Sequence, residues 1–267
     1  MTTQTQGKAV ITGASSGIGF TYADRLAQRG FDLMLVARDQ ARLEALATDL
    51  RAKHSINVEV AKADLTQPAD VSVLEQRLRS DASITLLVNN AGVALSTPLA
   101  ESDLGEVDRL IQLNIVALTH LSSAAAAGFA ARGTGAIVNI ASVVPLLPER
   151  FNAVYAASKA YVLSLTQSLA AEMSEKGVQV QAVLPGATRT EIWERAGMDI
   201  NAFPPEMVMD VNEMVDAALA GFDQRELVTI PSLPDAADWK AFTQARFALG
   251  PNLSLQHAAQ RYKTAGA

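Results

Sequence analysis

The sequence predicts an α/β domain built on a doubly wound parallel sheet of about seven strands, with helices on both faces. Short β-prone runs alternate with helical segments as far as about residue 230, as in parallel sheets. The polar and glycine-rich motifs follow directly after strands, where ligands of such sheets bind. Hydrophobic residues make up 49% of the 267, enough for a sizeable core. We expect a single domain over residues 1–267, with a core at about 7–231 and a helical tail at about 232–267.

The first half of the chain contains four expected strands and three expected helices. Gly30 is a typical stop signal for the first helix, and Pro68 fits the first turn of the third. The strands are expected at 8–11, 31–37, 57–63 and 84–88, and the helices at 20–29, 39–53 and 68–79.

The second half continues the alternation. Residues 152–175 contain neither Gly nor Pro and are rich in Ala, Leu and Ser, which favours a helix. Helices are expected at 102–132, 152–175 and 211–222, and strands at 135–140, 178–184 and 227–230.

The tail beyond residue 231 has an amphipathic pattern. Trp239, Phe242, Arg246 and Leu249 recur at helical spacing. We expect a helix that docks over the pocket, docks on a neighbouring subunit, or packs on its own domain.

Composition excludes several classes of function. A net charge of -6 argues against a nucleic-acid footprint. The chain has no cysteine, which excludes disulfides and thiolate zinc sites, and its three histidines are far apart, so we expect no metal. The polar start, Met1 to Gln6, lacks a signal peptide's apolar core, and no apolar run reaches the ~20 residues of a membrane helix. A cytoplasmic protein without membrane contact is expected.

A glycine-rich turn follows the first expected strand. It reads Thr12-Gly13-Ala14-Ser15-Ser16-Gly17-Ile18-Gly19 and leads into a helix. Glycines let the backbone turn sharply and approach a phosphate, and the helix N-terminus offers free N–H groups to a pyrophosphate. The turn predicts a dinucleotide site.

Tyr155 and Lys159 stand four residues apart in an expected helix, so they lie on the same face. A lysine ammonium near a tyrosine favours the phenolate and lowers its pKa. We therefore expect a tyrosine able to act as a general acid and base near neutral pH.

Five motifs together resemble the short-chain dehydrogenase/reductase family. They are the T-G-x-x-x-G-x-G turn, N-N-A-G at 89–92, Ser142, Y-x-x-x-K at 155–159 and P-G-x-x-x-T at 185–190, in family order and spacing over about 7–231. The resemblance implies a Rossmann-like fold and hydride transfer between a nicotinamide cofactor and a carbonyl or alcohol carbon. It also leads us to expect a homodimer or homotetramer.

The resemblance implies a catalytic tetrad of Asn114, Ser142, Tyr155 and Lys159. Tyr155 would donate a proton to the carbonyl oxygen, and Ser142 would hydrogen-bond that oxygen. Lys159 would hold the nicotinamide ribose, and Asn114 would orient a water. Two alternatives stay open: Asn114 bonds backbone in a buried helix, and Ser142 caps a strand end.

Cofactor contacts are expected along the same edge of the sheet. Asp64 and Leu65 would lie beside the adenine, although Asp64 alternatively caps a turn. Thr190 would bond the nicotinamide carboxamide or, alternatively, cap a helix. The full set is Gly13, Ser15, Ser16, Gly17, Ile18, Gly19, Arg38, Asp64, Leu65, Asn90, Ala91, Gly92, Tyr155, Lys159, Pro185, Gly186, Thr188 and Thr190.

Arg38 predicts a preference for NADP(H) over NAD(H). It stands where the second strand ends, beside the expected adenosine ribose, and an arginine there can bind a 2′-phosphate. Asp39 is expected to cap the next helix. The alternative is a solvated Arg38 that only stacks on adenine. Ser16 is not basic, so Arg38 lacks an evident second cationic partner in the glycine turn.

The sequence allows two rival functions. Gly13 to Gly17 also fits the G-x-S-x-G elbow of serine hydrolases, with His257 as the formal base, but no earlier strand is available to build an oxyanion loop. A non-catalytic NADP(H)-binding sensor would be expected to lose part of the tetrad, which is complete here.

The loops near the expected pocket are apolar, which favours an uncharged, mainly hydrophobic carbonyl or secondary alcohol. The alternative is that several of these side chains fill the core or an interface. They are Val143, Val144, Pro145, Leu146, Leu147, Phe151, Ile192, Trp193, Met198 and Phe203. Arg189 and Arg195 are expected to be solvated rather than to bind an acidic group.

Overall fold

The computed structural model describes residues 6–263. The chain divides into two compact units, Met1–Pro231 and Ser232–Ala267. The first holds the sheet, and the second holds helix α9 (Ala236–Ala248), whose residues are all at least partly exposed. Residues 1–5 lie outside the described part, so the expectation of no signal peptide stays a prediction.

The first unit is built on a parallel sheet of seven strands, which confirms the predicted fold class. The strand order is β3-β2-β1-β4-β5-β6-β7, and every neighbouring pair is parallel. The direction of winding reverses between β1 and β4, which opens a crevice at the carboxyl ends of the strands. The strands are β1 (Lys8–Thr12), β2 (Asp32–Ala37), β3 (Val58–Lys62), β4 (Ile84–Asn89), β5 (Gly135–Ile140), β6 (Val178–Val183) and β7 (Val228–Thr229).

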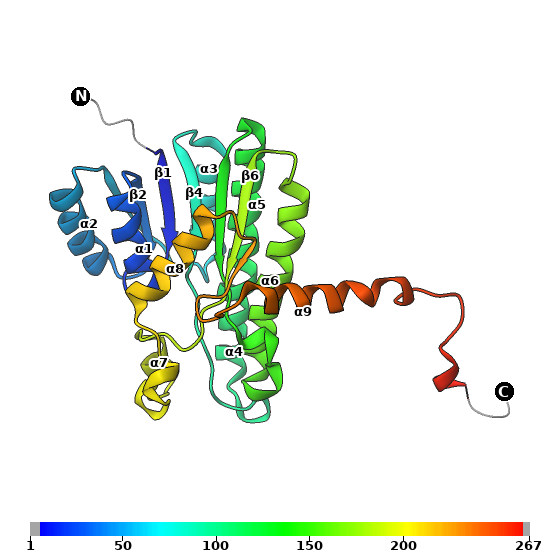
Figure 1. The fold of residues 1–267 in the computed structure, drawn as a ribbon. Helices are drawn as coiled ribbons and strands as arrows, with labels where there is room; N and C mark the ends of the chain where they lie inside the picture. The colour runs from blue at the N-terminus through cyan, green and yellow to red at the C-terminus, as the bar shows by residue number, and fades with distance from the viewer. Residues whose placement is uncertain (1–5, 264–267) are drawn as a thin grey trace. The chain divides into compact units, whose positions relative to one another are not determined.

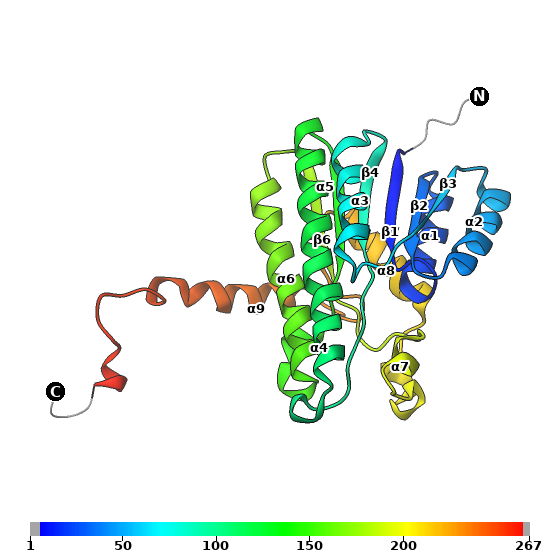
Figure 2. The same ribbon diagram turned by 180° about the vertical axis from the view of Figure 1, so that it is seen from behind.

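Helices cover both faces of this sheet. Successive strand residues point to opposite faces. Ile11 therefore packs in the core shared with α1, α2 and α8 (Figure 1), and Val10 packs with α3, α5 and α6 (Figure 2). The helices are α1 (Gly17–Gln28), α2 (Gln40–His54), α3 (Pro68–Ser80), α4 (Leu104–Ile111), α5 (Leu118–Arg132), α6 (Ala153–Met173), α7 (Ile192–Arg195) and α8 (Val211–Asp223).

Local sequence signals set several helix ends. Asp39 caps α2 as predicted, because its carboxylate accepts the Arg42 N–H at 3.0 Å. Gly30 follows α1 with φ +83°, the left-handed conformation that favours glycine. Helix α1 begins at Gly17, three residues before the predicted start, since the end of the glycine-rich turn forms its first turn.

The long helix predicted over 102–132 is continuous but irregular. Helices α4 and α5 are joined by a π-helical segment, Gln112–Ala117, which contains Asn114. By length and composition alone, Leu104–Arg132 would suffice to cross a membrane, but half of its most apolar stretch is buried inside the protein. Leu121 and Phe129 of α5 belong to the core on the sheet, as in a core helix of an α/β protein.

Candidate active site

A cleft of about 930 Å³ lies at the carboxyl ends of β1, β2, β3 and β4, beneath the loop that follows β6. Its size is within the roughly 300–1,000 Å³ usual for small-molecule sites. Twelve of the predicted cofactor residues line it: Gly13, Ser15, Ser16, Gly17, Ile18, Arg38, Asp64, Leu65, Asn90, Ala91, Gly92 and Thr190. The structure therefore brings together motifs that are far apart in the sequence.

The glycine-rich turn is shaped for close approach. Gly13 and Gly17 have φ of +67° and +55°. A Cβ on Gly13 would lie 2.8 Å from Asn90 Nδ2, and one on Gly19 would lie 2.4 Å from both Asn90 Nδ2 and the Gly13 carbonyl oxygen. Side chains are thus excluded, and backbone groups line this floor of the cleft, which fits a cofactor pyrophosphate.

Asn90 braces that turn. Its Nδ2 donates to the carbonyl oxygens of Thr12 at 2.9 Å and Gly13 at 3.2 Å. Thr12, which the sequence analysis did not single out as a site residue, accepts the N–H groups of Asn90 and Ala91 at 3.0 Å each through its Oγ1. The ends of β1 and β4 are locked together in this way. The sequence does contain a signal for this role, because Thr12 is the last residue of a strand and directly precedes a glycine-rich turn.

Tyr155, Lys159 and Ser142 meet beside the end of β5. The Asn152 side chain caps α6 by accepting the Tyr155 N–H at 2.9 Å, which fixes the start of the helix. Ser142 lies close enough to the Tyr155 hydroxyl to lower its pKa. Lys159 Nζ donates to the Ile140 carbonyl oxygen at 2.8 Å and lies 5.9 Å from the centre of the tyrosine ring. The predicted same-face pair therefore forms one cluster with the serine.

The pKa values in this cluster are set by burial. Burial raises the pKa of Tyr155 to about 12, against the lowering effect of the Ser142 hydrogen bond. Burial also lowers the pKa of Lys159 to about 8. The expectation that Lys159 lowers the tyrosine pKa is wrong for the chain by itself. Desolvation disfavours both charged forms, and Lys159 is not among the groups that lower the Tyr155 pKa.

Asn114 is buried in the π-helical segment and bonds backbone. Its Oδ1 accepts the Val93 N–H at 3.0 Å, and its Nδ2 donates to the Val93 carbonyl oxygen at 2.9 Å. A Cβ on Gly92 would lie 3.2 Å from Asn114 Oδ1 and 3.7 Å from Lys159 Nζ, so the two side chains flank Gly92. Asn114 therefore bonds backbone, as the alternative predicts, and it also stands beside Lys159, so its catalytic role stays a prediction.

The loop after β6 connects the two sides of the cleft. The Pro185 carbonyl accepts from Ser142 Oγ at 3.4 Å, so this hydroxyl also holds the loop at a strand end. Thr188 is buried, and its Oγ1 donates to the Gly186 carbonyl oxygen at 3.1 Å. A Cβ on Gly17 would lie 3.2 Å from Thr190 Cβ, so the loop reaches the glycine turn.

Charged side chains gather at the other end of the cleft. Arg38 is exposed and forms no hydrogen bond or ion pair with any residue from 6 to 263. Asp64 accepts the Thr66 N–H at 3.0 Å and the Thr66 hydroxyl at 2.8 Å, which confirms the turn-cap alternative. Burial pulls the pKa of Asp64 upward, but the Thr66 bonds and the charges of Arg38 and Arg109 hold it below its usual value.

Several further residues outside the predicted cofactor set line this charged end. Arg42 of α2 pairs with Glu191, and Arg195 of α7 pairs with the same carboxylate. Arg109 and Glu106 contribute from α4. For Arg42 a signal existed, since it follows Arg38 by four residues. For the others only the folded chain brings them to the cleft.

The apolar loop residues divide between core and surface. Val144 is buried, as the core alternative predicted, whereas Leu147 and Phe151 are about half exposed. Trp193 and Phe203 pack with ring centres 5.0 Å apart, and Trp193 Nε1 donates to the Thr188 carbonyl oxygen at 2.8 Å. These rings consolidate the loop after β6.

The hydrolase hypothesis finds no support in the geometry of the turn. Ser15 forms no hydrogen bond with a histidine or carboxylate within the described residues. Between residues 6 and 263 there is also no group of three His, Cys, Asp or Glu side chains suited to hold a metal ion.

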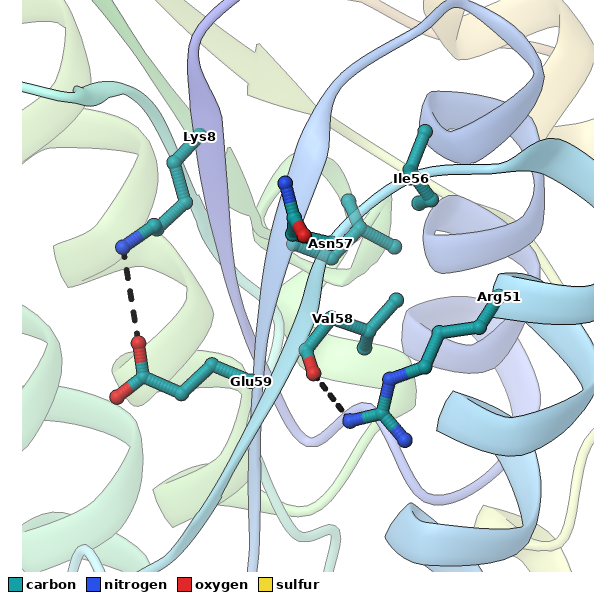
Figure 3. Close-up of a pocket in the computed structure, with 7 residues that line it drawn as sticks. Lys8, Arg51, Ile56, Asn57, Val58 and Glu59 are labelled. Carbon is teal, nitrogen blue, oxygen red and sulfur yellow. Dashed lines mark hydrogen bonds and ion pairs between the residues drawn. The ribbon is translucent and has the colours of Figure 1, made fainter.

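A second, smaller pocket of about 230 Å³ lies at the opposite end of the sheet, beside the starts of β1 and β3 (Figure 3). Its charged groups are already engaged: Lys8 pairs with Glu59 at 3.6 Å, and the Arg51 guanidinium donates to the Val58 carbonyl oxygen. Because the sequence motifs all lie at the carboxyl ends of the strands, this pocket is not the candidate site.

Comparisons with known proteins agree with this arrangement. A family model described as short chain dehydrogenase matches residues 7–201. An uncharacterized oxidoreductase of Staphylococcus epidermidis is 32% identical over 223 residues, which cover 83% of this chain and 93% of the relative.

Two solved structures are similar over nearly the whole chain. A short-chain dehydrogenase from Sphingobium yanoikuyae in complex with NADPH is 54% identical, with a TM-score of 0.94, and the match covers 96% of this chain and 100% of that one. The bulky-bulky ketone specific alcohol dehydrogenase from Comamonas testosteroni is 49% identical, with a TM-score of 0.89, covering 97% of this chain and 99% of that one.

Proposed function

Since the chain belongs to the short-chain dehydrogenase family and is an oxidoreductase of that family, we propose that it transfers a hydride between NADP(H) and a bulky, mainly hydrophobic ketone or the matching secondary alcohol. The observation that carries the proposal is the Ser142–Tyr155–Lys159 cluster beside a glycine-floored cleft. Support for the cofactor and the substrate class comes from the NADPH complex and from the ketone-specific enzyme among the similar structures.

The residues of the cleft fit a nicotinamide dinucleotide. The glycine-rich turn would hold the pyrophosphate, Asp64 and Leu65 would lie beside the adenine, and Lys159 and Thr190 would hold the nicotinamide half. When bound, the cofactor supplies or accepts the hydride, and the protein positions the reacting groups.

Tyr155 acts on the substrate oxygen. In reduction, negative charge grows on the carbonyl oxygen as the hydride arrives at carbon, and the phenol hydroxyl gives it a proton. Ser142, which lies close enough to the Tyr155 hydroxyl to lower its pKa, would donate a hydrogen bond to the same oxygen and fix its position. A tyrosine with a raised pKa stays protonated at neutral pH, as the proton donor in ketone reduction must be.

Lys159 and Asn114 position the tyrosine and resupply its proton. Lys159 is held by the Ile140 carbonyl, which aims its ammonium into the space around Gly92. Asn114 flanks the same space, where its Oδ1 would orient a water that passes protons toward Lys159.

Arg38 supplies the preference for NADP(H). Its guanidinium is exposed at the end of β2 and forms no ion pair in the described chain, so it is free to bind a 2′-phosphate. Cytoplasmic location, assembly as a homodimer or homotetramer, and independence of nucleic acid and membrane stay predictions.

A substrate panel tests the proposal. Purified protein is assayed with aldehydes, small ketones, ketones carrying two bulky substituents, β-ketoacyl thioesters and secondary alcohols, each with both cofactors. We expect the highest kcat/KM with NADPH and the bulky ketones. Tight NADPH binding without turnover of any carbonyl would favour the sensor hypothesis and contradict an enzymatic role.

A further inference from the structure

Charged and polar side chains from three separate segments meet at the rim of the cleft. Arg42 of α2 places its Nη1 3.1 and 2.9 Å from the two carboxylate oxygens of Glu191, which directly precedes α7. Arg195 of α7 donates to the same carboxylate and, at 3.3 Å, to Ser16 Oγ of the glycine turn. All four residues line the cleft.

These contacts tie the two halves of the fold together across the crevice. Glu191 and Arg195 belong to the loop that follows β6, whereas Arg42 and Ser16 follow β2 and β1. Ser96, which follows β4, makes a further link to this loop, because its Oγ donates to the Ala196 carbonyl oxygen at 2.9 Å. The loop therefore forms a strap over the cleft, and Arg42–Glu191 is its connection to α2.

Arg42 has the chemistry and the place of a phosphate ligand. It stands four residues beyond Arg38, and both residues line the cleft. The two Arg42 contacts with carboxylate oxygens of Glu191 are of the kind that a guanidinium makes equally with phosphate. The Glu191 carboxylate thus occupies a position in which a phosphate group would be bound.

We propose that Arg42 is the second cationic group for the 2′-phosphate of NADP(H), and that Glu191 is its counter-ion until the phosphate replaces the carboxylate. Cofactor binding then releases the strap from α2, while Arg195 keeps Glu191 at the glycine turn. The inference rests on the proposed use of NADP(H). It supplies the cationic partner that Ser16 cannot provide.

The exchange is energetically reasonable. The side chains of Arg42 and Glu191 are 49% and 43% exposed, and ion pairs so open to water contribute little net stability. A doubly charged phosphate flanked by Arg38 and Arg42 forms stronger charge-assisted bonds. Glu191 is therefore displaced readily, and its competition weakens NADP(H) binding only severalfold.

The test is a set of dissociation constants for NADPH and NADH, measured by cofactor fluorescence so that no substrate is needed. Arg42→Gln should raise the Kd of NADPH about tenfold, the equivalent of ~1.4 kcal/mol, and leave that of NADH within about twofold. Glu191→Gln should lower the Kd of NADPH about two- to fivefold and leave that of NADH unchanged. In the double variant most of the Glu191 effect should be lost, because the proposed competition is for Arg42.

A matched control is Arg29→Gln, which removes an exposed Arg29–Asp223 pair with contacts of 2.8 Å outside the cleft. It should change neither constant. An unchanged NADPH-to-NADH ratio in Arg42→Gln, or weaker NADPH binding in Glu191→Gln, would overturn the inference. Arg38→Asp in the same assay separates the role of Arg42 from the proposed use of NADP(H). If Arg38→Asp also leaves the ratio of the NADPH and NADH dissociation constants unchanged, the proposed use of NADP(H) fails as well.

Discussion

The site has two ends that differ in how water reaches them: its buried end is the cluster of Asn114, Ser142, Tyr155 and Lys159 beside Gly92, and the other is the charged end of the cleft. At the buried end, Asn114 and Lys159 are 1% and 7% exposed, and burial raises the pKa of Tyr155 to about 12 and lowers that of Lys159 to about 8. At the charged end, Arg38 and Arg42 are exposed, and their charges are screened. Single groups at the buried end should therefore control the chemical step, whereas the charged end should control cofactor choice through several modest contributions.

The largest expected effect is that of Tyr155→Phe at the buried end. The change removes the proton donor and very little apolar surface, so kcat should fall about 10²- to 10⁴-fold, the usual contribution of general acid–base catalysis. NADPH affinity, measured by fluorescence, should stay within about twofold of wild type. A variant that keeps more than about a tenth of the wild-type kcat would show that another group is the main acid.

A smaller effect is expected from Arg38→Asp at the charged end. Hydrogen bonds to charged groups contribute roughly 1.5–3 kcal/mol, so wild-type kcat/KM should be about ten- to a hundredfold higher with NADPH than with NADH. The substitution should shrink or reverse this ratio by weakening NADPH use, with kcat for NADH little changed. Equal kcat/KM for the two cofactors in wild type would mean that Arg38 does not bind the phosphate.

Lys159→Met tests how much the burial of the lysine charge lowers the free energy of unfolding. Burial lowers the pKa of Lys159 from 10.5 to about 8, so the unfolded chain binds this proton more tightly, and wild-type stability should rise between pH 8 and pH 10.5. At pH 7 the full penalty of about 3 kcal/mol applies, partly offset by the hydrogen bond to the Ile140 carbonyl, worth about 1–3 kcal/mol with its desolvation. The variant should be inactive but about 1 kcal/mol more stable at pH 7.

The sign of that difference should reverse as pH rises. Near pH 10.5 the wild-type lysine no longer carries the penalty, while the variant still lacks the hydrogen bond, so the variant should be the less stable protein. Urea unfolding without added cofactor, at pH 7 and above pH 10, measures both free energies. Lys176→Met, which replaces a lysine at an exposed position, is the matched control. A constant difference for Lys159→Met would refute the burial argument.

Much of the fold and the arrangement of the site could be predicted because the signals are local. Alternating strands and helices fix a parallel sheet, and motifs at strand ends must then meet at one edge. Asp39 caps the start of α2 and Gly30 follows the end of α1, as the preferences of these residue types predict. The same reasoning placed Arg38 at the cleft, because it directly follows a strand.

What the sequence did not reveal depends on contacts between distant segments. Glu191 is 149 residues from Arg42, and nothing local to either residue indicates the pair. The π-helical segment around Asn114 follows no composition signal, since its residues would equally form a regular helix. The prediction that the Tyr155 pKa is lowered is wrong, because helical spacing indicates which side chains are neighbours but not how deeply they are buried.

The smallest expected effect on the core concerns the tail that contains α9. None of the residues of α9 is buried, and Phe242, Phe247 and Leu249 are at least half exposed. Removing the chain after Leu233 therefore takes no α9 side chain from the buried core, and the melting temperature should stay within about 2 °C, the equivalent of less than about 1 kcal/mol. A larger fall would support packing of the tail on its own domain.

KM, kcat and oligomer mass of the truncated protein then separate the other two alternatives. A changed KM for bulky ketones at constant mass indicates docking over the pocket, and a lower mass indicates docking on a neighbouring subunit. Unchanged values of all three would exclude both functional roles and leave catalysis to the residues of the cleft.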